Sequence, residues 1–496
     1  MKISVSKLDE LERMIQNSNL LSVRNEVKSI TAKDVPRFLV ARFSNLLKRI
    51  GEIKMALKIL NPIIFNPMAS PEVEEIIEYA SCLSRASLED ESIAMLNKIK
   101  NYSNPEIQFE LAAAQIKKWN YSEAIPLLNE YINSQGQDPY RICVGKINLG
   151  AAYLYSNQLQ LAENQLHQIL PSVQGKGHEL LCGYTLLLLT EAALLDRKLE
   201  IAEKFLNSSA QKLNNFNHRY GLYFKKWKII IKMIKESGSK ESLFGYEELR
   251  KNAAKLRNWN VICDLELFRG VASNNTEAIK HLYYGVPYQG LRNRILFVWG
   301  KPLSLELFYD RRIGPKSNEA KEIFDVTTCT DLSTGNSLKA GQTLFRLMRA
   351  LSSDFYSPFL TTKIFSIVYK NTSYNPFSSS EQVYKAIRRL NDWLKKNKSP
   401  LYVESTAEGY RLRSKNPYIL RLPLQFSINT SLEGFITKLA SCGLVDRFSL
   451  KAVVKKLGIP NRTASRLLSD AVASGYLLRQ GKGKNVNYSL QQQQSA

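Results

Sequence analysis

Residues 149–166 read LGAAYLYSNQLQLAENQL, and this stretch decides the class of fold. Gly150 and Tyr153 stand at helical spacing before a polar turn, and Ala162 and Leu166 stand at helical spacing after it. Small residues such as Gly150 and Ala162 let two helices approach closely, while the larger side chains fill the seam between them. The stretch therefore predicts two helices joined by a short turn.

The same pattern recurs along the first half of the chain. A polar turn leads to an alanine that is followed by apolar residues at helical spacing, and the alanines stand 30 to 40 residues apart. One such hairpin cannot bury its apolar face alone, so neighbouring hairpins must stack into a continuous core. The five segments are 51–60, 90–99, 120–128, 157–166 and 197–206, with Ala56, Ala94, Ala124, Ala162 and Ala202.

The LGxxY string at 149–153, followed by Ala162 and Leu166, resembles the tetratricopeptide consensus, whose period is about 34 residues. The resemblance implies a tetratricopeptide-like α-solenoid over residues 1–280. Such a solenoid would offer a concave surface to a protein or peptide partner, or to a second copy of the chain in a homodimer. A plain helical bundle without a ligand is the alternative. The carboxylates of the repeats are expected on solvated faces, and the basic residues of the cluster at 220–227 likewise.

The positive charge of the chain lies mostly in its last third. The whole sequence carries 69 Lys and Arg against 45 Asp and Glu, a net charge of +24. Residues 339–496 hold 25 basic and 8 acidic residues, a net of +17, which leaves +7 for residues 1–338. Charge of this density attracts a polyanion through steering and counterion release. A lysine-rich surface without a partner is the plainer alternative.

Residues 281–320 are expected to form a small β-containing connector. They contain glycine and proline punctuation and β-favouring runs such as ILFVW at 295–299. From residue 321 onward, short strands should lead into three helices and a β-hairpin. The expected strands are 323–329 and 337–339, the expected helices are 343–351, 361–369 and about 378–396, and the expected hairpin is 401–412.

The strings VYKAIRRLNDWL at 383–394 and YVESTAEGYRL at 402–412 resemble the recognition helix and wing of the winged-helix domain of OmpR-type response regulators. The resemblance covers residues 321–414 and implies DNA binding. Asp392 and Trp393 replace the usual basic pair before the last helical leucine, and Glu408 precedes the single Gly409. No receiver domain precedes this module, so control by phosphorylation is not implied.

The polar face of the predicted recognition helix lies opposite Ile387 and would enter the major groove, where Arg pairs with guanine and Gln with adenine. Arg388 lies on the flank of this face. The wing arginines suit phosphate or minor-groove contact. The candidate DNA-binding residues of this module are Gln382, Lys385, Arg388, Arg389, Lys396, Arg411 and Arg413.

A second module is expected at residues 430–490. Helices at 432–442, 449–457 and 462–474 precede a hairpin whose turn is glycine-rich, and this order resembles a broad class of bacterial winged-helix domains. Binding of a protein instead of DNA is the alternative for this module. Its candidate DNA-binding residues are Arg462, Thr463, Ser465, Arg466 and Ser469 on the third helix, and Lys482 and Lys484 in the wing.

Signatures of catalysis are missing from the sequence. The chain has no HExxH, GxSxG or GxGxxG motif, and its six cysteines have no CxxC spacing, so we expect no enzyme, no metal and no cofactor. Residues 1–19 lack the apolar core of a secretory signal, and the most apolar stretch, 180–195, is short and contains Glu191. These features favour a cytoplasmic protein without a membrane partner.

The sequence therefore predicts a mainly α chain: a tetratricopeptide-like α-solenoid, a β-containing connector and two α+β winged-helix domains. The function that fits best is a transcriptional regulator whose tandem winged helices bind double-stranded DNA. The alternative is a tetratricopeptide scaffold whose winged helices bind protein. Base readout on RNA is disfavoured, because the A-form major groove is too narrow for a helix.

Overall fold

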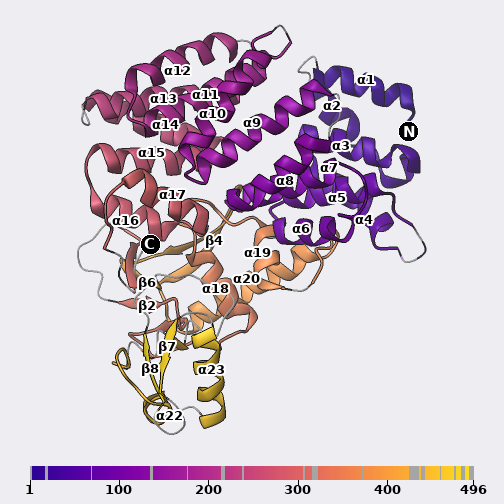
Figure 1. Ribbon diagram of the computed structural model, residues 1–496. Coiled ribbons are helices and arrows are strands. Elements are labelled where there is room, and N and C mark those ends of the chain that lie inside the picture. The colour runs from indigo at the N-terminus through magenta and orange to yellow at the C-terminus, as the bar shows by residue number, and fades with distance from the viewer. Residues whose placement is uncertain are drawn as a thin grey trace. The chain divides into compact units, whose positions relative to one another are not determined.

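The fold is mainly helical, with small sheets confined to the later part of the chain (Figure 1). The computed structural model describes residues 3–16, 20–66, 68, 70–134, 138–175, 177–213, 218–236, 240–304, 306, 308–315, 322–370, 372–423, 435–436, 439, 442–457, 460–473, 476–481 and 486–490. Two compact units make up the chain. The first, the helical unit, contains Met1–Ser304, Phe355–Ser366 and Lys370–Val383, and the second, the C-terminal unit, contains Leu305–Asp354, Ile367–Tyr369 and Tyr384–Ala496.

Consecutive helices of the helical unit contact each other from α3 to α17, and odd-numbered helices also contact the next odd-numbered helix within α3–α7 and within α9–α17. This pattern is that of helical hairpins placed side by side. The helices are α1 (Val5–Gln16), α2 (Leu20–Val27), α3 (Val40–Ile50), α4 (Ile53–Ile64), α5 (Val73–Arg85), α6 (Glu89–Lys98), α7 (Glu106–Lys117), α8 (Tyr121–Ser134), α9 (Pro139–Tyr155), α10 (Leu159–Val173), α11 (Glu179–Leu195), α12 (Leu199–Leu213), α13 (His218–Lys235), α14 (Lys240–Lys255), α15 (Trp259–Ala272), α16 (Thr276–Gly285) and α17 (Gln289–Trp299), with short 3-10 turns at Ala32–Asp34 and Arg37–Leu39.

The turn inside each of the five hairpins from α3–α4 to α11–α12 has the same backbone conformation. Its central residue has a positive φ, and the residue after it donates its N–H to a carbonyl in the last turn of the first helix. Gln158 donates in this way to Tyr153 at 2.9 Å, and Lys198 donates to Ala193 at 2.8 Å. Such a bond satisfies a helix-end carbonyl and fixes the direction of the next helix. The central residues are Gly51, Ser87, Trp119, Asn157 and Arg197.

A small buried residue follows each of these turns. Ala56, Ala124, Ala162 and Ala202 are fully buried, as the repeat pattern predicted. Ala94 is exposed, so the prediction that it is the small packing residue of the second segment is wrong. Ser92 occupies the equivalent buried position, and its hydroxyl donates to the Ala80 carbonyl at 2.7 Å. A serine was overlooked there because its polarity suggests a turn, yet a hydroxyl that bonds the backbone can be buried at low cost.

Two glycines show how closely the paired helices approach. A Cβ atom added at Gly150 would lie 2.7 Å from Leu166 Cδ2, and one added at Gly183 would lie 2.4 Å from Leu213 Cγ. Real Cβ atoms do not approach side chains this closely. The prediction that Gly150 allows a close approach of two helices is therefore confirmed.

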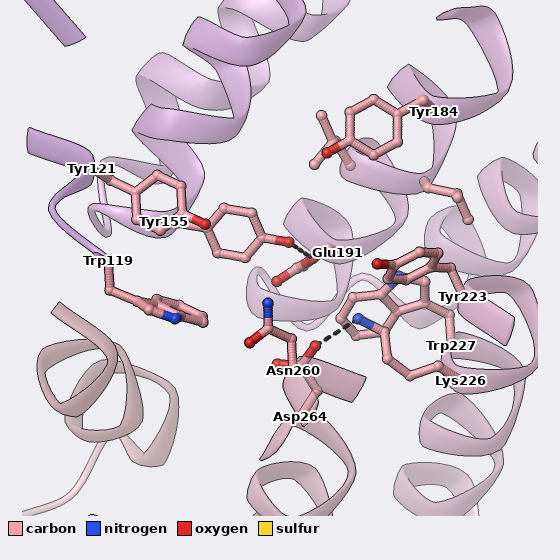
Figure 2. A pocket seen from close by; sticks show the side chains of 12 residues that line it. Trp119, Tyr121, Tyr155, Tyr184, Glu191, Tyr223, Lys226, Trp227, Asn260 and Asp264 are labelled. Carbon is pink, nitrogen blue, oxygen red and sulfur yellow. Dashed lines mark hydrogen bonds and ion pairs between the residues drawn. The ribbon is translucent and has the colours of Figure 1, made fainter. Parts of the chain in front are cut away.

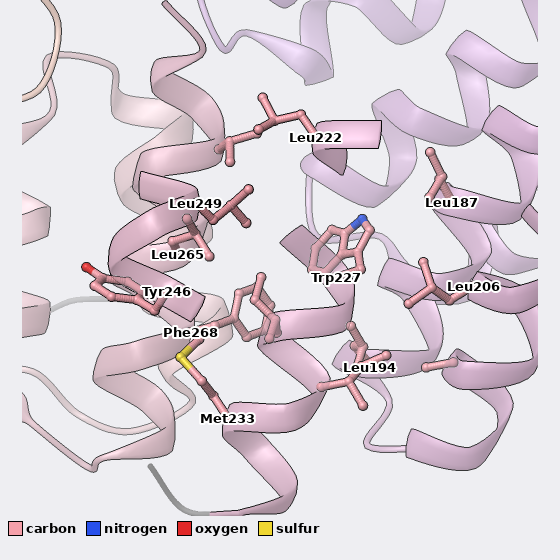
Figure 3. Packing of buried hydrophobic residues seen from close by; sticks show 14 of the residues in the cluster. Leu187, Leu194, Leu206, Leu222, Trp227, Met233, Tyr246, Leu249, Leu265 and Phe268 are labelled. Carbon is pink, nitrogen blue, oxygen red and sulfur yellow. The ribbon is translucent and has the colours of Figure 1, made fainter. Parts of the chain in front are cut away.

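Large apolar residues fill the core between α11 and α15 (Figure 3). Trp227 is almost fully buried and packs edge-on against Phe268, with ring centroids 5.7 Å apart. Leu194 and Leu206 from the preceding hairpin complete this cluster. The burial of such large side chains is the main stabilising contribution to packing in this part of the unit.

The β-favouring run at 295–299 is helical, so the expectation of strand there is wrong. It lies in α17, where Leu291, Ile295 and Trp299 are buried and repeat at the spacing of one helical face. The run was ambiguous because a short apolar stretch satisfies both periods, and packing against the other helices decides the outcome. The residues assigned to the connector do contain one strand, β1 (Phe308–Ile313).

The C-terminal unit contains a four-stranded sheet of order β1-β6-β2-β3. β6 (Tyr418–Pro423) pairs antiparallel with β1 and parallel with β2 (Ile323–Asp325), and β2 pairs antiparallel with β3 (Thr330–Asp331). The buried Tyr418 hydroxyl donates to Asp331 at 2.8 Å. The sheet thus extends beyond the expected module, 321–414, on both sides.

The expected helices and hairpin of the first module are confirmed. They are α18 (Thr343–Ser352), α19 (Thr361–Val368), α20 (Ser379–Lys396), and the antiparallel strands β4 (Leu401–Thr406) and β5 (Gly409–Ser414). In the second module, α22 (Leu450–Leu457), α23 (Asn461–Ala473), β7 (Leu477–Gln480) and β8 (Asn487–Leu490) match the expected order. Most of the helix expected at 432–442 lies outside the described residues.

The segment 355–383, which was expected to belong wholly to the first module, packs largely within the helical unit. Phe355 donates its N–H to Gly285 at 2.9 Å, and the Lys363 ammonium pairs with Glu89 at 3.1 Å. The Tyr374 N–H donates to both carboxylate oxygens of Glu91 at 3.0 Å. The chain therefore passes from one unit to the other several times before residue 384.

Candidate nucleic-acid interface

Helix α20 divides cleanly into a buried face and an exposed basic face. Val383, Ile387, Leu390 and Leu394 are buried at the spacing of one helical face. The candidate residues Gln382, Lys385, Arg388, Arg389 and Lys396 are all exposed. Since the exposed part includes four cations from one helix, this face presents a strip of positive charge.

Three of these four cations have no acidic partner among the residues that the structure describes. Within the described part of the chain, no carboxylate pairs with Arg388, Arg389 or Lys396. Burial raises the pKa of Tyr369, and the positive charge of Arg389 acts in the opposite direction. The planar donors of Arg388 and Arg389 remain accessible to an anionic partner.

One asparagine ties the hairpin to α20. The Asn391 side chain accepts the Val403 N–H at 2.7 Å and donates to the Val403 carbonyl at 3.2 Å. An amide that bonds both groups of one residue acts like a strand neighbour and fixes β4 relative to the helix. The basic face of α20 and the hairpin therefore form one rigid element of structure.

The two wing arginines differ in their surroundings. Arg413 is exposed, and its Nε donates to Glu404 on the opposite strand at 3.0 Å. Arg411 is half-buried; burial lowers its pKa, and the neighbouring Arg413 adds to that effect. Arg413 therefore reaches solvent while Arg411 lies partly within the hairpin.

A cationic cleft beside the hairpin was not found from the sequence. It encloses about 380 Å³ and is lined by Arg311 and Arg312 of β1 and by Arg413 of β5, with Glu404 as its acid. Gly314 closes one end, where φ is +92° and an added Cβ would lie 2.3 Å from the Asn416 carbonyl oxygen. The cleft carries a surplus of cations, and arginines so placed favour an anionic ligand.

The sequence offered little signal for this cleft. Arg311 and Arg312 stand more than a hundred residues before β6, and only the pairing of β1 with β6 brings them beside the hairpin. The strand itself is short and contains three consecutive charged residues, 310–312. Such long-range pairing cannot be read from local patterns.

The second module places its candidate residues on the outside of α23. Arg462, Ser465, Arg466 and Ser469 are exposed and Thr463 is half-buried, whereas Ala464, Leu468 and Ala471 are buried. Its core includes Phe448, which stacks on Tyr488 with ring centroids 6.2 Å apart. Lys451 and Lys455 of α22 are further exposed cations. Lys482 and Lys484 lie outside the described residues.

Among the residues that the structure describes, no three His, Cys, Asp or Glu side chains are placed to share a metal ion. All six cysteines are free thiols, and burial raises the pKa of Cys82 to about 12. No helix in the described ranges has the length and apolarity that crossing a bilayer requires.

Comparisons with known proteins assign neither a family nor a function to the chain. No family model matches the chain, and no curated protein matches its sequence.

Proposed function

We propose that this protein is a transcriptional regulator that binds double-stranded DNA through two winged-helix modules in its C-terminal unit. In this proposal α20 and α23 are the helices that enter the major groove, and the β4–β5 and β7–β8 hairpins are the wings. The helical unit would be a tetratricopeptide-like solenoid that receives a signal or a partner.

The observation that carries this proposal is the basic face of α20. Arg388, Arg389 and Lys396 are exposed together, opposite a fully buried apolar face. A hairpin fixed to the same helix by Asn391 adds Arg413, and β1 adds Arg312. A groove-entering helix needs exposed hydrogen-bond donors, and flanking cations hold the phosphates on either side of the groove.

The solenoid part of the proposal is supported by the repeated hairpin turn. Residues from Gly51 to Arg197 adopt the same left-handed turn at five places, each followed by a small buried residue. Recurrent geometry of this kind is typical of stacked helical repeats, whose inner surfaces bind ligands or partners.

A salt titration of DNA binding by the full-length protein tests the proposal. We expect the logarithm of the association constant for random-sequence duplexes to fall linearly with the logarithm of salt concentration, because each neutralised phosphate releases counterions. Selection from a pool of random duplexes should then enrich a defined sequence.

Arg389→Ala tests the role of the helix face. We expect weaker binding to the selected duplex by about 1–3 kcal/mol, about 5- to 150-fold, and a relaxed preference at one base pair. Arg312→Ala should instead weaken binding to all duplexes alike and reduce the salt slope by about 1. Lys225→Ala, at an exposed lysine of the helical unit, is the matched control and should change neither.

A flat salt response, together with unchanged binding by Arg389→Ala and Arg466→Ala, would contradict the proposal. That result would favour the alternative of a scaffold whose C-terminal modules bind protein.

A further inference from the structure

The helical unit contains a cavity of about 410 Å³, and half of the residues that line it are aromatic (Figure 2). Trp119, Tyr121 and Tyr155 form one wall, with ring centroids 5.0–6.0 Å apart. Tyr184 and Tyr223 are two further aromatic members of the lining. The side chains come from α8, α9, α11, α13 and α15 and from the turn before α8.

A buried carboxylate lies at the base of this cavity. Glu191 is 1% exposed, and its Oε2 accepts a hydrogen bond from the Tyr155 hydroxyl at 3.0 Å. Its Oε1 pairs with Arg294 of α17, which is fully buried and also lies over the Tyr155 ring at 4.6 Å. The expectation that the repeat carboxylates lie on solvated faces is wrong for Glu191, because α17 covers it.

A second buried ion pair lies beside the first. Lys226 is 2% exposed and donates to Asp264 Oδ2 at 2.7 Å, with its ammonium 3.7 Å from the centroid of the Trp227 ring. Lys225 is exposed as expected, but Lys226 was expected on the same solvated face and is buried. Asn260 stands at the edge of the cavity, where it is exposed.

Two buried ion pairs in one cavity are a costly arrangement. Removing four charges from water carries a desolvation penalty that their mutual attraction offsets only in part, and apolar side chains of similar size would stabilise the fold at least as well. The charges at these positions are therefore better explained by what they present to a ligand than by stability.

The charged groups that line the cavity indicate whether its ligand is a cation or an anion. Glu191 and Asp264 line the cavity with one cation, Lys226, whereas Arg294 lies behind Glu191 and is not part of the lining. The faces of the aromatic rings in the lining carry partial negative charge as well, and those of Tyr155 and Trp227 already attract Arg294 and Lys226. An anion would meet two carboxylates and these ring faces, while a cation would be attracted by both.

We propose that this cavity binds a small organic ammonium ion, held by the aromatic walls and by the carboxylates of Glu191 and Asp264. The inference goes beyond DNA binding and would stand if the DNA proposal failed. It also assigns an input to the helical unit, for which the sequence named no ligand contacts.

The test is a titration of the full-length protein that follows its intrinsic tryptophan fluorescence, to which Trp119 and Trp227 of the lining contribute. Choline is the cationic probe, 3,3-dimethylbutan-1-ol is its uncharged isostere, and 3,3-dimethylbutanoate is the anionic counterpart. We expect saturable quenching by choline below about 10 mM and at least tenfold weaker binding of the other two probes. Sodium chloride at the same ionic strength controls for screening.

Variants connect the signal to the cavity. Tyr184→Ala removes an exposed wall residue without disturbing the core and should weaken choline binding at least fivefold. Asp264→Asn should weaken it further, with circular dichroism to verify folding. Tyr102→Ala, at an exposed tyrosine outside the cavity, should bind choline as the parent protein does. Equal binding of choline and its uncharged isostere, no saturable binding of choline, or an unaffected Tyr184→Ala variant would each overturn the inference.

Discussion

Lys117 on α7 has an exposed side chain whose ammonium group is partly shielded from water by the helical unit. Its ammonium donates to the Ser84 carbonyl at 2.8 Å. Burial lowers its pKa to about 8, and the nearby Glu89 opposes this shift only in part. A lysine in the unfolded chain keeps its proton up to a pKa near 10.5. The folded state therefore holds fewer protons than the unfolded state between these two values.

Lys117→Met should change how stability depends on pH. Because the unfolded parent protein binds more protons from about pH 8 to pH 10.5, this lysine makes the free energy of unfolding rise with pH in that window. The variant should be more stable than the parent at pH 7 by less than about 1 kcal/mol, because water screens an exposed side chain, and the difference should shrink toward pH 10. Urea unfolding midpoints measured at several pH values check this.

The exposed Lys225, replaced by Met in the same way, gives the control series. If Lys117→Met and Lys225→Met shift the midpoint equally at all pH values, shielding of the Lys117 ammonium has no energetic consequence.

Residue-level prediction from the sequence succeeded where the rule was local. The exposure of Arg389 and Lys396 follows from helical geometry, as does the burial of Ala162. It failed for Ser92 and Glu191, whose polar side chains were expected to be exposed to solvent but are buried. In both cases a partner distant in sequence, the Ala80 carbonyl or Arg294, satisfies the polar group, and local patterns do not contain such partners.

Among the elements, α17 has the most consequential position within the helical unit. Its Gly290 lies so close to the turn before α8 that an added Cβ would be 1.9 Å from the Trp119 carbonyl oxygen. Its Arg294 reaches Glu191 of α11 and the Leu154 carbonyl of α9, the latter at 3.4 Å. One helix near the end of the unit thus joins three earlier hairpins.

Gly290→Ala should loosen the docking of α17. The backbone carbonyl at Trp119 cannot move aside as a flexible side chain could, so we expect a loss of about 1–3 kcal/mol in the free energy of unfolding. Faster hydrogen exchange of the amides in α17 should accompany it. Thermal unfolding and exchange measured by mass spectrometry are the readouts.

Gly221→Ala is the matched control, because no atom lies within 4 Å of the position of its added Cβ. It should be neutral or stabilising by up to about 1 kcal/mol, since alanine is the better helix former. Equal changes in the two variants would show that the contact with Trp119 does not determine the result.

Element prediction from the sequence was most successful for the helices of the C-terminal unit. α18, α20 and α23 were found close to their bounds, because each has a strong apolar period between polar turns. α17 was mistaken for a strand because its apolar run is short. β6 was not foreseen, since its pairing with β1 depends on contacts more than a hundred residues apart.

On the scale of the whole molecule, segments of the two units alternate along the sequence. Residues 355–366 and 370–383 belong to the helical unit, although the C-terminal unit has begun before them. Ile364 and Phe365 are buried, and Lys363 and Tyr374 bond to Glu89 and Glu91. A fragment that begins at residue 321 would contain this segment without its partners.

Such a fragment, residues 321–496, should be less ordered than the same residues in the full chain. We expect it to bind the dye ANS and to lose protection from hydrogen exchange over α19, because Ile364 and Phe365 would meet water. The full-length protein under the same conditions is the reference. Equal protection of α19 in the fragment and in the full chain would refute the assignment of this segment to the helical unit.

The alternation of the two units along the chain also restricts how such a protein can change by recombination. No single crossover between residues 304 and 384 exchanges one unit and leaves the other whole. A chimera joined near residue 304 takes the segment 355–383 from the second parent. The first parent must then supply acids at the positions of Glu89 and Glu91, because Lys363 and Tyr374 bond to them. The two halves are therefore expected to have been inherited together.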